Sequence, residues 1–393
     1  MKYRHENFGG IIASEEPPLL AFVDRDYLRE IGASESPKWD TPDTSIGQLS
    51  APTEVHVAIT NACSNACPHC YMSSGERDAD EMDTATFKRA MKTLADMGVF
   101  HVALGGGEAL ERPDLFEISA YCREIGLVPN LTTSGKGMTP DIASQMSVFG
   151  QVNLSLDGVG ELSGVFRGIN QFDQVDAALK MLKDAGVPSG INCVVGRPNY
   201  DGLRDLFAYA KQAGLNEIEL LRFKPSGRGK ELYARMKTTV EQNKALLPML
   251  QELTEQQDLR CRIDCSFVPM LCWHKPPLEL LEAFGTYGCE AGNVLMAGRS
   301  NGRISGCSFL PDQGSSIFEM PETWTADPDY GTLRRWRDSA PEPCRSCDYV
   351  SLCNGGCHAV SLAVTGDLYA PDPDCPAVAA YETASCDRSQ PRS

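Results

Sequence analysis

The 393-residue sequence lacks the features of a membrane protein and of a nucleic-acid-binding protein. It has no run of about 18 apolar residues, so a membrane span is not expected. Its first residues, MKYRHENFGG, contain no apolar segment of a secretory signal, and we therefore expect a cytoplasmic protein. Basic residues are scarce: 36 Lys and Arg stand against 53 Asp and Glu, which gives a formal charge of −17. Because such a surface repels phosphate backbones, we expect no nucleic-acid partner.

Cysteine is the residue type present in excess, with 16 in the chain, most of them clustered. Clustered thiols in a long chain without a signal are more often metal ligands or redox groups than disulfides. The first cluster, Cys63, Cys67 and Cys70, follows VHVAIT, whose alternation predicts a strand. Three thiolates do not complete a zinc site unless His69 adds a fourth ligand. They do suit a cubane iron–sulfur cluster in which one iron stays open to a further ligand.

A second group of cysteines lies near the C-terminal end, in the Gly-rich segment PCRSCDYVSLCNGGC. Such spacing indicates a metal site, either a zinc ribbon or an iron–sulfur cluster. Its members are Cys344, Cys347, Cys353 and Cys357, and Cys375 follows in PDPDCP. Cys289 and Cys307 form a looser third group. The remaining cysteines are expected to be small buried side chains (Cys122, Cys193, Cys261, Cys265 and Cys272) or, for Cys386, a free thiol in a polar tail.

These patterns resemble a known family. The spacing of Cys63, Cys67 and Cys70 at the end of a first strand resembles the radical S-adenosylmethionine (SAM) superfamily, and the C-terminal cysteines resemble its SPASM extension. The SPASM pattern is formed here by Cys289, Gly302, Cys307, Cys344, Cys347, Cys353, Cys357 and Cys375. Together the two resemblances cover roughly residues 53–380.

The resemblance implies that SAM is contacted by residues at the ends of several expected strands. LGGGEAL contains a GGE loop, in which glycines permit close backbone approach and a carboxylate meets the SAM ammonium. Arg167 is implied to pair with the SAM carboxylate, and His69 to lie beside the adenine. The complete implied set is His69, Gly106, Gly107, Glu108, Thr132, Thr133, Ser134, Ser155, Asp157, Arg167 and Arg222.

The middle of the chain alternates short apolar runs with amphipathic stretches, which predicts a parallel sheet with helical crossovers. Strands are expected at 53–59, 101–105, 128–132, 151–155, 190–195 and 217–222, and helices at 83–97, 112–124, 138–147, 172–185, 201–213 and 238–255. Six such units give an α/β fold, a partial (β/α)6 TIM-like barrel that stays open. For residues 1–50 the sequence predicts two short strands around EEPP, then a short helix and a Pro/Ser/Asp linker.

The expected domain organisation follows from these segments. An N-terminal hairpin and linker (1–50) is either a truncated PqqD-like peptide-recognition element or a hairpin packed on the barrel. The radical SAM barrel (51–260) and a bridging region (261–285) come next. A SPASM domain with two auxiliary clusters (286–385) and a tail (386–393) complete the chain.

The auxiliary clusters implied by the resemblance are unequal. One takes Cys344, Cys347, Cys353 and Cys375, and the other takes Cys289, Cys307 and Cys357, which is one ligand short. Mycofactocin-type maturases have a further cysteine where this chain has Met296. An open iron is the favoured interpretation. The alternatives are a displaced thiolate from Cys261, Cys265 or Cys272, or the thioether of Met296, a poorer ligand than thiolate.

The segments SSGERD, GGGE, LRFKPSGRG and CNGGCHA resemble mycofactocin-type peptide maturases. That resemblance implies an oxidoreductase that reductively cleaves SAM to a 5′-deoxyadenosyl radical and crosslinks or decarboxylates a ribosomally made peptide. The implied partners are the peptide, alone or with a separate recognition protein, and a flavodoxin or ferredoxin reductant.

Two other functions stay open at this point. One is tetrapyrrole side-chain modification of the haem d1 pathway type, and the other is sulfatase-type maturation, with Asp264 or Asp348 as base. Lys224, Arg228 and Lys230 are candidates to hold an anion at the barrel mouth, or else form an ordinary basic loop. The sequence identifies neither the substrate nor the bond formed.

Overall fold

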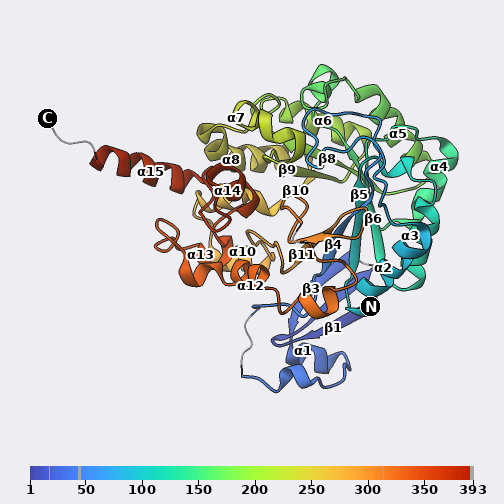
Figure 1. Ribbon diagram of the computed structural model, residues 1–393. Coiled ribbons are helices and arrows are strands. Elements are labelled where there is room, and N and C mark those ends of the chain that lie inside the picture. Colours follow the sequence, from blue (N-terminus) through green and yellow to red (C-terminus); the bar gives the residue numbers. More distant parts are fainter. Residues whose placement is uncertain (17, 43–45, 313, 390–393) are drawn as a thin grey trace.

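The computed structural model describes residues 1–16, 18–42, 46–312 and 314–389, with no side chains for 385–389. Its main sheet has the strand order β10-β9-β8-β7-β6-β5-β4-β11-β12 (Figure 1). The six central strands are parallel and follow one another in chain order, so the sequence prediction of six βα units is confirmed. They are β4 (Glu54–Thr60), β5 (His101–Gly106), β6 (Val128–Thr133), β7 (Val152–Ser155), β8 (Ser189–Val195) and β9 (Glu217–Arg222).

Helices connect these strands and cover the outside of the sheet (Figure 1). They are α2 (Thr84–Asp96), α3 (Leu115–Glu124), α4 (Pro140–Gln145), α5 (Phe172–Asp184), α6 (Leu203–Ala213), α7 (Tyr233–Met236) and α8 (Val240–Gln257). Helix α2 shows why they form. Its buried residues Phe87, Met91 and Leu94 recur at helical spacing and pack in one core with Val55 and Val57 of β4.

Two parallel strands extend the sheet beyond the predicted six. Strand β10 (Arg260–Ile263) pairs with β9, and β11 (Leu295–Gly298) pairs with β4 on the opposite side. The two-residue β12 (Ile304–Ser305) then pairs antiparallel with β11. The six expected strand ranges do not include these strands, because none exceeds four residues, too few for alternation to be clear. The strand order ends at β10 and β12, which is consistent with a partial barrel.

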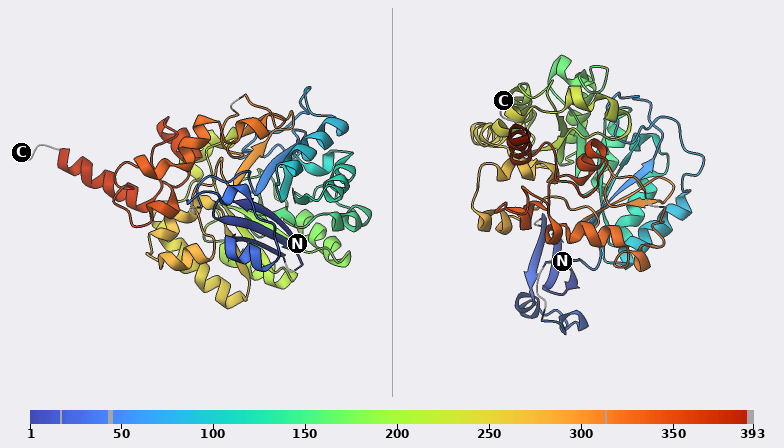
Figure 2. Two further views of the ribbon diagram at one scale, coloured as in Figure 1. Left: turned by 90° about the horizontal axis from the view of Figure 1, so that it is seen from below. Right: turned by 60° about the vertical axis from the view of Figure 1, so that its left-hand side comes forward.

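The N-terminal segment contains three antiparallel strands. They are β1 (Lys2–Glu6), β2 (Gly9–Glu15) and β3 (Pro18–Asp24), followed by α1 (Arg25–Glu30). Of these, β2 and β3 are the two strands predicted around EEPP, and β1 is additional. The sequence did not predict β1, because charged residues such as Arg4 and Glu6 are typical of exposed segments. In the structure these two form a buried ion pair of 2.7 Å. Arg4 also donates to the carbonyls of Ala51, Pro52 and Gly98, which joins this small sheet to the barrel (Figure 2).

Short helices form most of the C-terminal part, which lies against one side of the barrel (Figure 1). They are α9 (Val268–Cys272), α10 (Leu278–Ala283), α11 (Met320–Thr323), α12 (Pro328–Arg334), α13 (Val350–Cys353), α14 (His358–Thr365) and α15 (Pro376–Ser389). Single 3-10 turns lie at Pro37–Trp39, Ala109–Glu111, Met146–Val148, Gly160–Gly164, Gly227–Leu232, Cys265–Phe267 and Trp336–Ser339.

Helix α15 extends away from the rest of the chain (Figure 2). It continues through Ser389, so the first four residues of the predicted tail, 386–389, are helical rather than irregular. The last part of that prediction, 390–393, lies outside the described residues. None of the helices in the described ranges combines the length and the apolar character needed to cross a bilayer.

We predict that Arg4→Ala lowers the free energy of unfolding by about 3–5 kcal/mol, because it leaves the Glu6 carboxylate buried without its cation. Arg29→Ala is the matched control, since Arg29 pairs with Asp26 and Glu35 at the surface and its loss should change little. Urea denaturation of both variants, followed by circular dichroism, measures the difference. Equal midpoints for the two variants would contradict the assigned role of Arg4.

Candidate functional site

A cavity of about 830 Å³ runs along the inner face of the sheet, from the ends of the strands to the C-terminal part of the chain. This volume suits a small-molecule cofactor together with part of a substrate. The cysteine loop after β4 lines the cavity with Cys63, Cys67 and Cys70. Of the residues implied to contact SAM, all but Asp157 also line it: His69, Gly106, Gly107, Glu108, Thr132, Thr133, Ser134, Ser155, Arg167 and Arg222.

Backbone contacts fix the shape of the cysteine loop. The N–H of Cys63 donates to Gly75 at 2.8 Å, which closes the loop. Arg228 donates from Nε to the carbonyl of Cys67 (3.0 Å) and from Nη1 to that of Ser74 (2.7 Å). Its own N–H donates to the carbonyl of Cys70. The guanidinium that the sequence offered as an anion binder therefore braces the cysteine loop instead.

The GGE loop lies against the cysteine loop at a distance that only glycine permits. A Cβ on Gly107 would lie 2.0 Å from the carbonyl oxygen of Ala62. Gly106 has a φ of +104°, and a Cβ there would lie 2.6 Å from the carbonyl of Thr60. The Glu108 N–H donates to Ala62 at 2.9 Å, so the two loops form one hydrogen-bonded unit.

Glu108 places a buried carboxylate on the cavity wall, with an exposed fraction of 2%. Its oxygens accept hydrogen bonds from the Thr133 hydroxyl and from the N–H and hydroxyl of Ser134. No ion pair within the described ranges includes Glu108. A buried carboxylate that is hydrogen-bonded but lacks a cation is complementary to an ammonium group. The ammonium of SAM fits this requirement.

Arg167 lines the same cavity, but its charge is already paired. Its Nε lies 2.7 Å from Oδ2 of Asp157, and the other oxygen of Asp157 accepts the Val194 N–H at 2.8 Å. Burial lowers the pKa of Arg167, but the nearby Asp157 more than reverses this and the net shift is upward. Asp157 is fully buried behind the cavity wall. It therefore positions Arg167, and it is the one residue of the implied SAM set that does not line the cavity.

His69 is neutral and fixed in orientation. Its Nδ1–H donates to the carbonyl of Phe166 at 2.9 Å, and the two rings are 5.7 Å apart. Burial lowers the pKa of His69 to about 4. Burial also raises the pKa of the thiols of Cys63 and Cys67, so ligation of a metal by these cysteines would release protons.

Within the part of the chain that the structure describes, no three His, Cys, Asp or Glu side chains converge on a single-ion site. Zinc holds its thiolates at about 2.3 Å and would need such convergence. An iron–sulfur cluster contains several metal atoms and spreads its ligands further apart. Three thiolates suit an iron–sulfur cluster in which one iron stays open to a further ligand.

The C-terminal cysteines form two groups. One group comprises Cys344, Cys347, Cys353 and Cys375. Burial, and to a smaller extent the nearby thiols of Cys353 and Cys375, raises the pKa of Cys344 to about 12. In the other group, Cys357 belongs to a separate buried cluster, and the partly buried Cys289 and Cys307 pack against this cluster. Asn354, Gly355 and Gly356 all have positive φ and turn the chain between Cys353 and Cys357. A Cβ on Gly356 would lie 2.5 Å from Cβ of Asp372, so this turn requires glycine.

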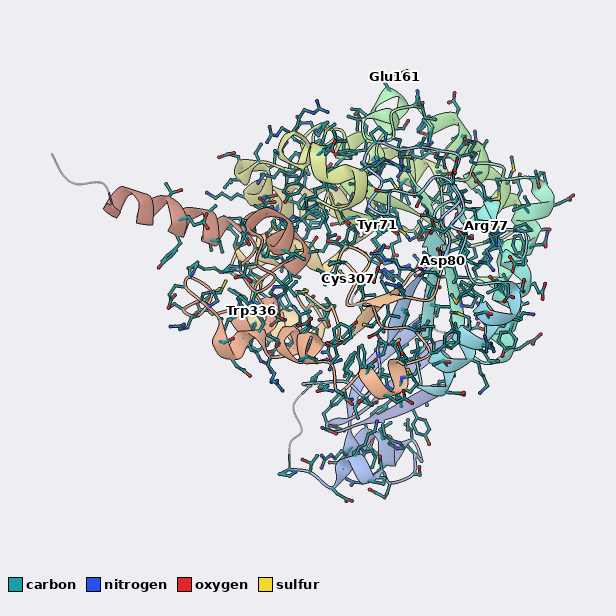
Figure 3. All side chains as sticks on the ribbon, viewed as in Figure 1. Tyr71, Arg77, Asp80, Glu161, Cys307 and Trp336 are labelled. Atoms are coloured by element: carbon teal, nitrogen blue, oxygen red, sulfur yellow. The ribbon has the colours of Figure 1, made fainter. Side chains whose placement is uncertain are left out.

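The two halves of the molecule meet beside the cysteine loop. The ring of Tyr71, next to Cys70, lies 5.0 Å from that of Phe309, two residues after Cys307. Figure 3 labels Tyr71 and Cys307 in this central region, between the barrel and the C-terminal part. Phe309 lines the cavity, so the group that contains Cys307 lies next to the space that the first cysteine loop faces.

Arg222, which the resemblance implied as a cofactor contact, lines the cavity and is also held by buried partners. Its guanidinium donates to Asp372 and, at 2.7 Å, to Asp374, and also to the Ser266 carbonyl at 3.1 Å. The two aspartates more than offset the effect of burial, and the pKa of Arg222 is raised. With these donors engaged, Arg222 joins the end of β9 to the PDPDC segment and acts as a positioning residue.

Sequence reasoning did not find the partners of the cationic side chains. PDPDC was noted for Cys375, but no signal links Asp372 to an arginine 150 residues earlier. Lys224 was a candidate anion binder, and the structure pairs its ammonium with Asp264 and places it 4.3 Å from the ring centre of Phe309. Lys230 is exposed and does not line the cavity.

We predict that Gly107→Ala separates the GGE loop from the cysteine loop and costs about 1–3 kcal/mol of stability, because the new Cβ would overlap the Ala62 carbonyl. Gly105→Ala is the matched control, since its Cβ would have nothing within 4 Å. Thermal denaturation and iron retention after anaerobic reconstitution measure both effects. A Gly107→Ala variant as stable and as iron-rich as Gly105→Ala would contradict the close approach.

Comparisons with known proteins agree with this geometry. Residues 57–210 match the model of the radical SAM superfamily. The chain is 31% identical over 338 residues to mycofactocin maturase MftC of Mycobacterium tuberculosis, covering 83% of each protein. It is 31% identical over 337 residues to the PqqA peptide cyclase of Ruegeria pomeroyi, covering 83% of this chain and 87% of the cyclase.

A third relative and a solved structure extend the comparison. An AdoMet-dependent heme synthase of Methanosarcina barkeri is 29% identical over 350 residues, covering 84% of this chain and 98% of the synthase. The fold matches Streptococcus suis SuiB bound to its precursor peptide SuiA, with a TM-score of 0.75, 19% identity, and coverage of 95% of this chain and 98% of SuiB. On the matched residues and the identity to these relatives, the chain belongs to the radical SAM superfamily.

Proposed function

We propose that this protein is a radical SAM oxidoreductase that modifies a ribosomally made peptide, by forming a crosslink or removing a carboxylate. The observation that supports it most is the shared cavity, in which Cys63, Cys67 and Cys70 face the unpaired carboxylate of Glu108. The two relatives at 31% identity are a peptide maturase and a peptide cyclase, which supports a peptide as the substrate class.

In this proposal Cys63, Cys67 and Cys70 hold a [4Fe–4S] cluster that, with SAM bound and one electron supplied, provides a 5′-deoxyadenosyl radical for hydrogen abstraction. The residues of the chain bind and orient. Glu108 receives the SAM ammonium and is held in place by Thr133 and Ser134. Thr132, Ser155 and Arg167 add polar groups along the wall, and the neutral His69 packs beside the cofactor. The electron donor is a flavodoxin or ferredoxin.

The substrate takes the rest of the cavity. Beyond the proposed cofactor site, the lining continues to Phe309 on one side and to Glu15, Leu19 and Leu20 of the N-terminal sheet on the other. A cavity that reaches a second structural unit suits an extended substrate better than a compact one. In this proposal the N-terminal sheet borders the entrance of the peptide, which is presented alone or by a separate recognition protein.

Two auxiliary iron–sulfur clusters complete the proposal. Cys344, Cys347, Cys353 and Cys375 hold one of them. Cys289, Cys307 and Cys357 contribute to the other, whose position beside Phe309 borders the substrate space. The proposed domains are those expected from the sequence: the N-terminal segment (1–50), the barrel (51–260), the bridging region (261–285) and the SPASM domain (286–385).

The alternatives receive less support. Sulfatase-type maturation needs a carboxylate base in the cavity, whereas Asp264 is paired with Lys224 and Asp348 is exposed, and neither lines the cavity. Tetrapyrrole modification is favoured by the heme synthase relative at 29% identity. To distinguish these substrates, the protein is incubated with SAM, a reductant and either a tetrapyrrole or a precursor peptide. Mass spectrometry then shows which of the two is modified.

We predict that the triple variant Cys63→Ala, Cys67→Ala, Cys70→Ala abolishes 5′-deoxyadenosine formation and lowers the iron content by about four atoms per chain. The assay is anaerobic incubation of reconstituted protein with SAM and dithionite. Cys122→Ala is the control, because Cys122 is buried on α3 outside the cavity. This variant should keep its iron content and its formation of 5′-deoxyadenosine. Undiminished deoxyadenosine from the triple variant would overturn the proposed function.

Glu108→Gln should weaken SAM binding about 10- to 100-fold, since it removes a charge-assisted contact worth about 1.5–3 kcal/mol. The variant should keep its iron, because Glu108 is not a proposed ligand. Glu117→Gln, at an exposed position on α3, serves as control. Equilibrium dialysis with labelled SAM measures the affinity, and equal binding by both variants would remove Glu108 from the SAM site.

A further inference from the structure

The group Cys289, Cys307 and Cys357 supplies three thiols where a four-iron cluster has four corners. The sequence left its fourth ligand undecided among an open iron, three displaced cysteines and Met296. The structure distinguishes between these candidates by where it places each side chain. The inference below rests on the proposed function, since it assumes that a cluster occupies this group.

Met296 lies outside the group. It is fully buried in β11, where it pairs with Val55 of β4, and its side chain packs in the main core of the barrel. Cys357 belongs to a second buried cluster that includes Phe166 and Leu310, and the partly buried Cys289 and Cys307 pack against this cluster. The neighbour of Met296 that lines the cavity is Ala297, and successive strand residues point to opposite faces. The thioether is therefore directed away from the cavity side of the sheet.

The cysteines of the bridging region separate into three places. Cys261 lies within β10, opposite Ile218 of β9, and interacts with Glu217 and Glu219. Cys272, at the end of α9, packs with Leu352 and is hydrogen-bonded to Cys353, a member of the four-cysteine group. Cys265 lies in the 3-10 turn after β10, between Asp264 and Ser266. Of these three cysteines, it is the one whose neighbours in the chain contact residues tied to the incomplete group.

Two sets of contacts, one on each side in the chain, hold Cys265 there. On one side, the carbonyl of Ser266 accepts from Arg222, and Arg222 binds Asp372, which accepts the backbone N–H of Cys357 at 3.0 Å. The residue after Cys265 and the backbone of Cys357 are thus tied to the same arginine–aspartate pair.

On the other side, the residue before Cys265 is tied to the Cys307 segment. The carboxylate of Asp264 pairs with Lys224, and the Lys224 ammonium lies 4.3 Å from the ring centre of Phe309. Phe309 follows Cys307 by two residues. Both neighbours of Cys265 in the chain are therefore fixed, through buried charges, to the segments that carry two of the three thiols.

We propose that Cys265 is the fourth thiolate of this auxiliary cluster, replacing the cysteine that the C-terminal pattern lacks at Met296. A cluster with four thiolates has no open iron, so it does not bind substrate through the metal and is limited to electron transfer. This differs from the open iron favoured by the sequence. Cys272 remains a buried thiol beside a group that already has four.

The test uses the full-length triple variant Cys63→Ala, Cys67→Ala, Cys70→Ala as parent. This parent lacks the proposed SAM-binding cluster, whose open iron would otherwise also bind the probe. Cys265→Ser is added to this parent, with Cys261→Ser added separately as the matched control. After anaerobic reconstitution, iron content is measured, and electron paramagnetic resonance spectra of the reduced protein are recorded with and without cyanide, a probe that binds only an open iron.

The parent and the Cys261→Ser protein should each hold about eight iron atoms per chain and give spectra that cyanide does not change. The Cys265→Ser protein should lose up to about four iron atoms, or keep them and acquire a cyanide-dependent spectrum. A Cys265→Ser protein indistinguishable from the parent overturns the inference. If that variant does not fold, the parent decides, since a cyanide-dependent spectrum there means an open iron. A parent with no iron at all refutes the auxiliary clusters of the proposed function instead.

Discussion

Arg222 ends the sixth strand of the barrel, and its guanidinium donates to Asp372 and Asp374, which come 150 and 152 residues later. The three charges are buried, so removal of Arg222 leaves Asp372 without its cation at a cost of about 3–5 kcal/mol. Asp372 also accepts the backbone N–H of Cys357. This network sets the position of the C-terminal cysteines relative to the barrel, and therefore the distance between the proposed clusters.

At the proposed cluster of Cys63, Cys67 and Cys70, glycine residues set the position of the cysteine loop. The GGE loop and the cysteine loop approach so closely that Gly107 has no room for a Cβ, and Arg228 braces the opposite side of the cysteine loop. Three thiols and the carboxylate of Glu108 then face one cavity. Hydrogen bonds hold these groups in place before any ligand arrives, so the binding of a charged cofactor requires little reorganisation.

The sequence predicted the six central strands and the cavity wall because both depend on local pattern. Apolar alternation marks β4 to β9, and strand ends in a parallel sheet meet at one edge, which places Glu108 near Thr133 and Ser134. Pairings distant in the chain left no such signal. β1 was missed because the charges of Arg4 and Glu6 are typical of an exposed segment, and no local pattern linked Arg222 to Asp372.

The central claim is that the cysteines form three iron–sulfur clusters around one SAM-binding cavity. Iron and acid-labile sulfide content of the anaerobically reconstituted wild-type protein, measured together with 5′-deoxyadenosine formation from SAM and dithionite, tests it most directly. Three clusters require about twelve iron and twelve sulfide per chain, and deoxyadenosine should be produced. Bound zinc, or about four iron without SAM cleavage, would contradict the claim.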